Sequence, residues 1–230
     1  MKSVVTIGLG YIGLPTSALI ASNGISVFGV DINQDIVDTI NRGEIHIVEP
    51  ELDVVVKSAV DNKLFRAGTK PIESDVYLIV VPTPFKGDRK PDISFVEDAT
   101  KKIIPMLKEN DLFIIESTSP VGTTEKMKDL IYSQRPELIN KLLIAYCPER
   151  VLPGNILYEL VHNDRVIGGI DDKSTKAAIK FYDHFVKGQL HPTNARTAEM
   201  CKLTENASRD AQIAFANELS FVCDKAKIDV

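Results

Sequence analysis

The sequence predicts an α/β fold with a doubly wound, mostly parallel sheet followed by one long connecting helix, and three observations carry that prediction. Over the first 190 residues, short apolar runs typical of strands alternate with longer helical patterns. A glycine-rich turn at residues 8–13 joins the first strand to the first helix. After Pro192 no glycine or proline occurs, and apolar residues recur at helical spacing.

The predicted strands are nearly continuous apolar runs, which is typical of parallel strands covered by helices on both faces. They lie at 4–9, 26–30, 76–81, 112–115 and 142–146, with two shorter ones at 166–168 and 188–191. The predicted helices lie between them, at 15–23, 34–41, 51–62, 94–108, 123–133 and 173–186.

The last part of the chain is predicted to be a single helix of roughly 30 residues, longer than usual for a globular domain. We therefore expect a first domain at residues 1–192 and the start of a central long helix at 193–230. The helical pattern reaches the last residue without a stop signal, so the chain is expected to be part of a longer protein.

Composition excludes several classes of protein. The 230 residues carry 27 Lys and Arg against 32 Asp and Glu, without a basic stripe, so no nucleic-acid partner is expected. No apolar run is long enough to span a membrane, and no signal peptide is evident. Three cysteines without metal-like spacing favour reduced thiols in a cytoplasmic protein. The four histidines show no ligand spacing, so no metal site is expected.

The turn after the first strand reads Gly8-Leu9-Gly10-Tyr11-Ile12-Gly13, the GxGxxG pattern of Rossmann dinucleotide-binding domains. Gly8 permits the tight turn, Gly10 lets a pyrophosphate approach the backbone, and Gly13 lets helix and strand pack closely. The helix that follows presents free N–H groups to the phosphates.

Asp31 ends the second predicted strand, 18 residues after Gly13. A carboxylate at this position accepts hydrogen bonds from the adenosine ribose and repels a 2′-phosphate. Ile32 and Asn33 supply no compensating cation, so the sequence predicts NAD rather than NADP as cofactor. The alternative is a glycine-rich turn that binds no ligand.

Three polar segments follow consecutive predicted strands: VPTP at 81–84, ESTSPVGTT at 116–124 and CPERVLPG at 147–154. Open α/β sheets bind ligands at these carboxyl ends. Together with KLTEN at 202–206, these segments resemble the UDP-glucose/GDP-mannose dehydrogenase family, and the resemblance covers essentially the whole chain.

The resemblance implies a four-electron oxidation of the C6 hydroxyl of a UDP-sugar by NAD, with two NADH formed per turnover. Segments 41–50, 82–88 and 197–206 resemble those of family members that act on UDP-N-acetyl-D-mannosamine. These members would function in polysaccharide biosynthesis. Pro153 stands where UDP-glucose dehydrogenases have glutamate, which puts glucose specificity in doubt. UDP-N-acetylglucosamine and UDP-glucose remain as alternative substrates.

The resemblance also implies roles for individual residues. Lys202 and Asn206 would stabilise developing negative charge on the reacting oxygen, and Glu149 would activate water. The positions that match cofactor contacts are Gly8, Gly10, Tyr11, Ile12, Gly13, Asp31, Thr83 and Thr118, of which Thr118 lies beside the nicotinamide. The positions that match substrate contacts are Arg150, Val151, Lys202, Asn206 and Arg209.

Six of these residues also have a simpler interpretation. Lys202, Asn206 and Arg209 could be ordinary solvated residues on a helix, and Glu149 could cap one. Thr83 and Thr118 could be turn residues that bond their own backbone.

The family's nucleophilic cysteine lies in a glycine-rich segment that does not occur in these 230 residues. Cys201 points about 100° away from Lys202 around the helix, and Cys223 lies about 31 Å further along it. Cys147 is nearer but reads as buried packing. We therefore expect an N-terminal fragment that lacks the nucleophile and the UDP-binding domain.

By resemblance, the long helix would form a homodimer interface, to which Phe215, Leu219 and Val222 could contribute. Two other classes remain open. One is a hydroxyacid dehydrogenase of the 6-phosphogluconate type, against which CPERVLPG argues. The other is a non-catalytic NAD-binding module.

Overall fold

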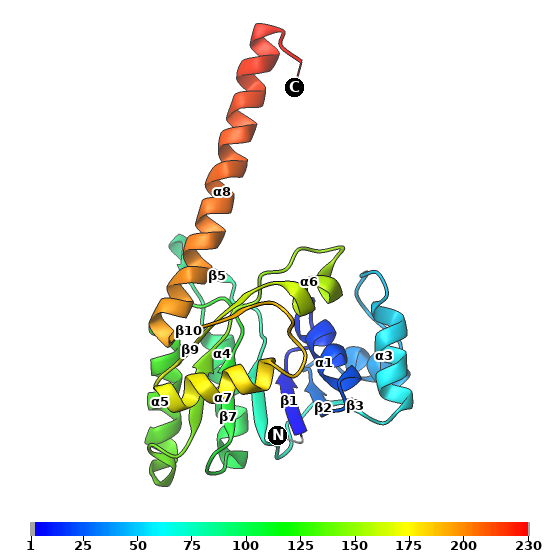
Figure 1. The fold of residues 1–230 in the computed structure, drawn as a ribbon, viewed down its shortest axis with the longest axis vertical. Helices are drawn as coiled ribbons and strands as arrows, with labels where there is room; N and C mark the ends of the chain where they lie inside the picture. The colour runs from blue at the N-terminus through cyan, green and yellow to red at the C-terminus, as the bar shows by residue number, and fades with distance from the viewer. Residues whose placement is uncertain (1–2, 230) are drawn as a thin grey trace.

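The computed structural model describes residues 3–229 and consists of an eight-stranded sheet, helices on both of its faces, and one projecting helix (Figure 1). The strand order is β10-β9-β8-β7-β4-β1-β2-β3. Its strands are β1 (Ser3–Ile7), β2 (Ser26–Val30), β3 (Phe65–Gly68), β4 (Val76–Ile79), β7 (Leu112–Ile115), β8 (Leu143–Tyr146), β9 (Arg165–Gly169) and β10 (Leu190–Asn194). A separate antiparallel pair is formed by β5 (Phe85–Lys86) and β6 (Lys90–Pro91).

The sheet is parallel from β3 to β8, and its direction then reverses. Tyr146 in β8 pairs with Gly168 in β9 in antiparallel register, and β10 runs parallel to β9. The chain passes from β1 to β2 and β3 on one side, and returns to place β4 on the other side of β1. This switch point is where doubly wound sheets bind ligands. The predicted doubly wound, mostly parallel fold is therefore confirmed.

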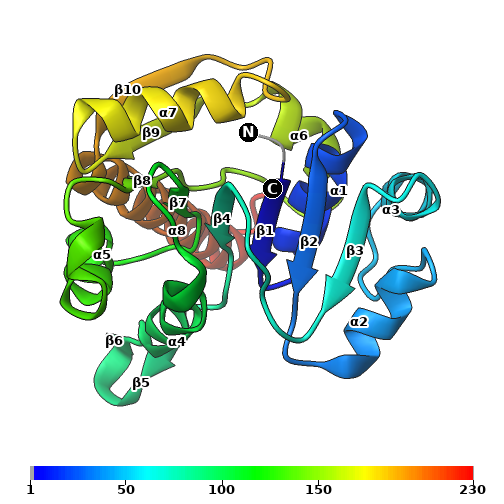
Figure 2. The same ribbon diagram turned by 90° about the horizontal axis from the view of Figure 1, so that it is seen from below.

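Helices cover both faces of the sheet (Figure 2), and an apolar cluster lies on each face. One face carries α1 (Gly13–Ser22), α2 (Gln34–Asn41), α3 (Leu52–Asp61), α6 (Ile156–His162) and α7 (Asp172–Tyr182). The other carries α4 (Ser94–Ile103), α5 (Thr123–Gln134) and the beginning of α8 (Ala195–Ala226). Short 3-10 turns occur at Gly87–Arg89, Ile104–Met106 and Pro136–Leu138.

The structure differs from the sequence-based elements in several places. It adds β3 and α6, which the apolar pattern did not predict. The helix expected at 94–108 ends at Ile103, because Pro105 cannot continue an α-helix and the chain tightens into a 3-10 turn. Helix α7 ends at Tyr182 rather than at residue 186.

Helix α8 spans 32 residues and confirms the predicted long helix. It begins two residues later than expected because Thr193 and Asn194 complete β10. The Asn194 side chain accepts a hydrogen bond from the Thr197 N–H at 2.9 Å and caps the helix. Beyond its first turns the helix leaves the body of the protein (Figure 1). Among the described residues, no helix combines the length and apolar character that crossing a bilayer requires.

Candidate cofactor cleft and catalytic residues

The glycine turn lies at the switch point, between β1 and α1. Gly8 has a φ of +97°, a conformation that a side chain disfavours. A Cβ on Gly13 would lie 1.8 Å from the Gly8 carbonyl oxygen, so only glycine allows helix and turn to pack this closely. A Cβ on Gly10 would meet nothing within 4 Å, so the backbone there faces open space.

A cleft of about 340 Å³ opens beside this turn. It contains most of the residues that the sequence proposes for the cofactor and places Glu149 with them. Its lining comprises Gly8, Gly10, Tyr11, Ile12, Asp31, Val80, Val81, Pro82, Thr83, Glu116, Ser117, Thr118 and Glu149. Within residues 3–229, no side chain caps the N-terminus of α1. The turn therefore offers free N–H groups and an open backbone approach, which fits a dinucleotide pyrophosphate.

Asp31 lies at one end of the cleft with both carboxylate oxygens held by the backbone. Oδ2 accepts a hydrogen bond from the Leu9 N–H at 3.1 Å, and Oδ1 accepts one from the Asn33 N–H at 3.0 Å. Each oxygen can accept a second bond, so the carboxylate still has room for ribose hydroxyls. Nearby, the Tyr11 hydroxyl donates to the Val48 carbonyl at 3.1 Å and holds the loop after α2 close to the glycine turn.

Lys202 and Glu149 meet beside the cleft, although they are 53 residues apart in the sequence. The Lys202 ammonium donates to the Glu149 carbonyl oxygen at 2.6 Å and to Oε1 at 3.2 Å. The other carboxylate oxygen accepts the Val151 N–H at 2.9 Å. The Lys202 side chain is only 7% exposed, so its ammonium group has little contact with water.

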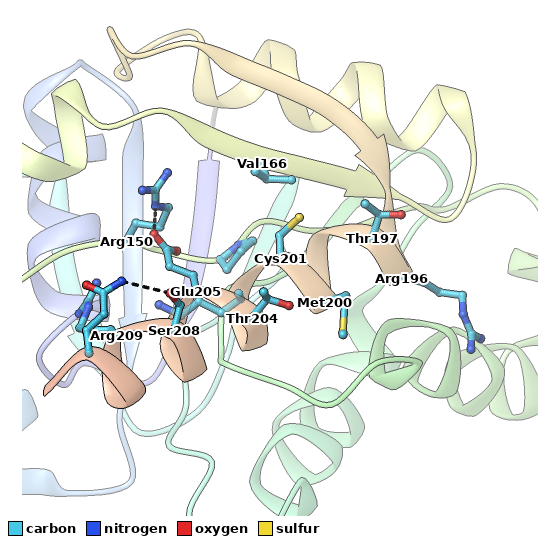
Figure 3. Close-up of a pocket in the computed structure, with 13 residues that line it drawn as sticks. Arg150, Val166, Arg196, Thr197, Met200, Cys201, Thr204, Glu205, Ser208 and Arg209 are labelled. Atoms are coloured by element: carbon cyan, nitrogen blue, oxygen red, sulfur yellow. Dashed lines mark hydrogen bonds and ion pairs between the residues drawn. The ribbon is translucent and has the colours of Figure 1, made fainter. Parts of the chain in front are cut away.

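A second, larger pocket of about 780 Å³ lies between the first turns of α8 and the segment after β8 (Figure 3). Lys202, Arg150, Arg196 and Arg209 line it, and Arg150 forms an ion pair with Glu205 at 2.6 Å. Asn206 is exposed and is absent from the linings of both pockets. The structure therefore brings Lys202, Glu149 and Val151 together, while Asn206 is exposed on α8 outside both linings.

Two buried carboxylates that the sequence analysis missed hold the segments around the site. Glu199, in α8, accepts hydrogen bonds from the Gly122 and Thr124 N–H groups, at 2.6 and 2.8 Å, at the N-terminus of α5. Glu49 accepts those of Gly154 and Ile156, at 2.9 and 2.8 Å, at the N-terminus of α6. Neither acid has a local sequence pattern that reveals its distant partner.

A third missed carboxylate, Glu116, lines the cofactor cleft at the end of β7. Its Oε1 accepts the Tyr182 hydroxyl at 2.5 Å and lies 4.0 Å from Arg165. Burial raises the pKa of Glu116, while the Arg165 charge lowers it. Cys147 is buried in the same cluster, and burial raises the pKa of its thiol to about 11.

The fold and the cleft together define a dinucleotide-binding α/β protein, and comparison with known families identifies which one. Residues 2–186 match the NAD binding domain of the UDP-glucose/GDP-mannose dehydrogenase family, and residues 196–230 match its central domain. The chain belongs to this family.

Curated relatives match the whole chain. It is 56% identical over 236 residues to the UDP-N-acetyl-D-mannosamine dehydrogenase of Escherichia coli K12, covering 99% of this chain and 56% of that protein. It is 53% identical over 237 residues to the NDP-N-acetyl-D-galactosaminuronic acid dehydrogenase of Ralstonia nicotianae, covering 100% of this chain and 56% of that protein. The chain thus spans just over half the length of these relatives.

Solved structures agree with this assignment. The native UDP-N-acetyl-mannosamine dehydrogenase of Staphylococcus aureus is 44% identical, with a TM-score of 0.90, over 97% of this chain and 55% of that one. The corresponding structure from Pyrococcus horikoshii is 41% identical, also with a TM-score of 0.90, over 97% of this chain and 54% of that one.

Proposed function

We propose that this chain forms the cofactor-binding half of an NAD-dependent dehydrogenase that oxidises the C6 hydroxyl of a UDP-sugar to a carboxylate. The observation that carries the proposal is the pairing of Lys202 with Glu149 beside the cleft that the glycine turn opens. We assign cofactor binding to residues 1–192 and the start of the central helix to residues 193–230.

The overall reaction consumes one water and two NAD⁺, and releases two NADH and three protons for each hydroxyl that becomes a carboxylate. NAD, when bound, accepts the hydride in each of the two oxidations. The Lys202 ammonium, held with little exposure, stabilises negative charge on the reacting oxygen. Glu149, which touches both Lys202 and the cofactor cleft, receives the proton of the water that completes the reaction.

The cofactor residues divide by position along the cleft. Gly8, Gly10, Ile12 and Gly13 form the pyrophosphate turn and Asp31 contacts the adenosine ribose. Tyr11 holds the adjacent loop. We place Thr83 and Thr118 toward the nicotinamide, because they follow β4 and β7, on the side of β1 away from Asp31.

The larger pocket suits the phosphate-bearing part of the substrate. Arg150 and Arg209 both line it, and guanidinium groups recognise phosphate oxygens well. Val151 follows Arg150 and would contact the sugar. Asn206 is exposed one helical turn beyond Lys202, and we propose that it contributes when substrate is bound.

The proposed substrate is UDP-N-acetyl-D-mannosamine. Support comes from the relatives of that name at 56% identity, and from Pro153, which replaces the glutamate of UDP-glucose dehydrogenases. The competing candidate is a galactosamine-derived nucleotide sugar, because the Ralstonia relative is named for N-acetyl-D-galactosaminuronic acid.

A thiol nucleophile is proposed to come from outside these 230 residues. Cys147 is fully buried, with its pKa raised to about 11, and Cys223 is near the far end of α8. Phe215, Leu219 and Val222 are exposed on α8, which supports a homodimer through this helix. The three free thiols fit a cytoplasmic location.

Calorimetric titration with NAD and NADP tests the cofactor assignment on this chain. We expect saturable NAD binding and at least tenfold weaker NADP binding. Failure of a folded chain to bind either dinucleotide would refute the proposed function. In a longer protein that contains this chain, NADH formation from UDP-N-acetyl-D-mannosamine, UDP-N-acetylglucosamine, UDP-N-acetylgalactosamine and UDP-glucose identifies the sugar. We expect UDP-N-acetyl-D-mannosamine to be the substrate and to yield two NADH per sugar.

A further inference from the structure

Glu116 is a buried acid in the cofactor cleft with one oxygen that lacks a partner. The residue is 2% exposed and lines the cleft together with Thr118. Among the residues that the structure describes, no hydrogen-bond donor reaches its Oε2. Buried carboxylate oxygens nearly always have a donor, because leaving one unpaired costs as much as desolvating it. A ligand bound in the cleft that Glu116 lines would supply such a donor.

The other side of the carboxyl group is held firmly. The Tyr182 hydroxyl donates to Oε1 at 2.5 Å, and the Arg165 guanidinium lies 4.0 Å from the same oxygen. Arg165 itself is fixed by a bond to the Leu160 carbonyl at 3.2 Å and by its position over the Tyr182 ring. These contacts engage Oε1, whereas Oε2, which is itself buried, has no partner among the described residues.

The position of Glu116 selects the part of the dinucleotide that it can reach. Asp31 follows β2, the glycine turn follows β1, and Glu116 follows β7, two strands beyond β1 on the opposite side. With the adenosine at Asp31 and the pyrophosphate at the turn, the nicotinamide lies toward β7. The carboxamide is the only group on the nicotinamide ring that carries hydrogen-bond donors.

We propose that Glu116 Oε2 accepts a hydrogen bond from the nicotinamide carboxamide and so fixes the orientation of the ring. This inference rests on the proposed NAD-binding function. The charged Arg165 beside the carboxyl group supports its ionised, acceptor form. Among the other titratable groups that influence Glu116, Tyr182 favours the ionised form through its hydrogen bond. Glu149 and Cys147 favour the neutral form by repulsion when they are ionised.

The test compares NAD with nicotinic acid adenine dinucleotide, in which a carboxylate replaces the carboxamide. That group has no N–H donor at neutral pH and would repel an ionised Glu116. ADP-ribose, which lacks the ring, measures binding by the rest of the cleft. By calorimetry at pH 8.5, we expect the unmodified chain to bind NAD at least about tenfold more tightly than the acid analogue.

Glu116→Gln changes the acceptor into a donor without changing its shape. Because Arg165 and Tyr182 both present donors, the amide oxygen should take the place of Oε1 and the NH₂ group should face the cleft. The preference for NAD should then fall below about threefold or reverse, while the affinity for ADP-ribose stays within twofold. Asp31→Asn is the matched control. It should lower the affinity for NAD, for the acid analogue and for ADP-ribose, and should leave the preference for NAD over the acid analogue unchanged.

A second variant and a measurement at a second pH test the same hydrogen bond independently. Glu116→Asp keeps a charge near Arg165 but retracts the acceptor, so NAD should lose about fivefold in affinity and ADP-ribose almost none. Because burial raises the pKa of Glu116, the preference of the unmodified chain should become smaller as the pH is lowered from 8.5.

Three results would contradict the inference. Equal affinity of the unmodified chain for NAD and its acid analogue would mean that Oε2 meets only water. An unchanged preference in a folded Glu116→Gln variant would assign the discrimination to another residue. If neither NAD nor ADP-ribose binds, the proposed function itself fails, a pattern distinct from the first two.

Discussion

The Lys202 ammonium and the Glu149 carboxylate form a largely buried contact that joins α8 to the segment after β8. Nζ lies 3.2 Å from Oε1 and 2.6 Å from the carbonyl oxygen of the same residue. The two side chains are 7% and 17% exposed, so water replaces neither partner easily. The contact therefore fixes the helix that carries the proposed catalytic lysine.

Lys202→Met should lower the free energy of unfolding by about 2–4 kcal/mol, because the partner oxygens lose their donor in a poorly hydrated place. Glu149→Gln should cost less, about 1 kcal/mol. The double variant should show a coupling energy of about 1–2 kcal/mol in urea unfolding. As a control, Lys57→Met breaks an exposed i,i+4 pair with Asp61 and should change stability little. Additive effects of the two buried substitutions would contradict the contact.

Gly10 and Gly13 should respond differently to the same substitution. Gly13→Ala places a methyl group 1.8 Å from the Gly8 carbonyl oxygen, so the melting temperature should drop and NAD binding should disappear. Gly10→Ala meets only open space and should melt like the unmodified chain. Its methyl group would nevertheless occupy the proposed pyrophosphate position, and NAD should bind at least about tenfold more weakly. Normal NAD affinity in Gly10→Ala would place the phosphates elsewhere.

Asp31→Asn should change which dinucleotide the chain prefers. The amide keeps an acceptor for the Leu9 or Asn33 N–H but loses the negative charge. NAD should bind about tenfold more weakly, and NADP should bind more tightly than to the unmodified chain, because the 2′-phosphate is no longer repelled. Calorimetry with both dinucleotides measures the change. Asp35→Asn, on the exposed first turn of α2, serves as control and should preserve the original preference.

Asp111 should make stability depend on pH. Burial raises its pKa to about 6, against an ordinary value of 3.8. Between those values the folded state binds more protons than the unfolded state, so this residue lowers stability as pH rises from about 4 to about 6. Asp111→Asn should remove about 1–2 kcal/mol of that decline. Urea titrations across this range measure it. The exposed Asp210→Asn should keep the slope of the unmodified chain.

Local sequence patterns predicted the sheet because its central strands are continuous apolar runs and because the glycine turn has a fixed spacing. They missed β3, in which only Phe65 and Ala67 face the core, and the seven-residue α6. The reversal at β9 was equally hidden. The pattern of Arg165–Gly169 predicts a strand but not its direction. The connection between β8 and β9 decides whether the two strands run parallel or antiparallel.

In the candidate site, too, local patterns predicted some residues and missed those whose contacts lie far apart in the sequence. Residues that follow strand ends, such as Asp31 and Thr118, could be proposed because the fold alone brings strand ends to one edge. Glu116 and Tyr182 are 66 residues apart, and no local pattern joins them. The one available sign was a charged residue directly after a wholly apolar strand, Leu112–Ile115.

The two helix-capping glutamates also have a consequence for how the chain folds. Glu199 closes contacts across 75 and 77 residues, and Glu49 closes contacts across 105 and 107. Helices α5 and α6 obtain these N-terminal acceptors only after distant parts of the chain have come together. Such long-range closure slows folding and couples distant segments. The beginning of α8 is therefore one of the elements on which cooperative folding of the NAD-binding domain depends.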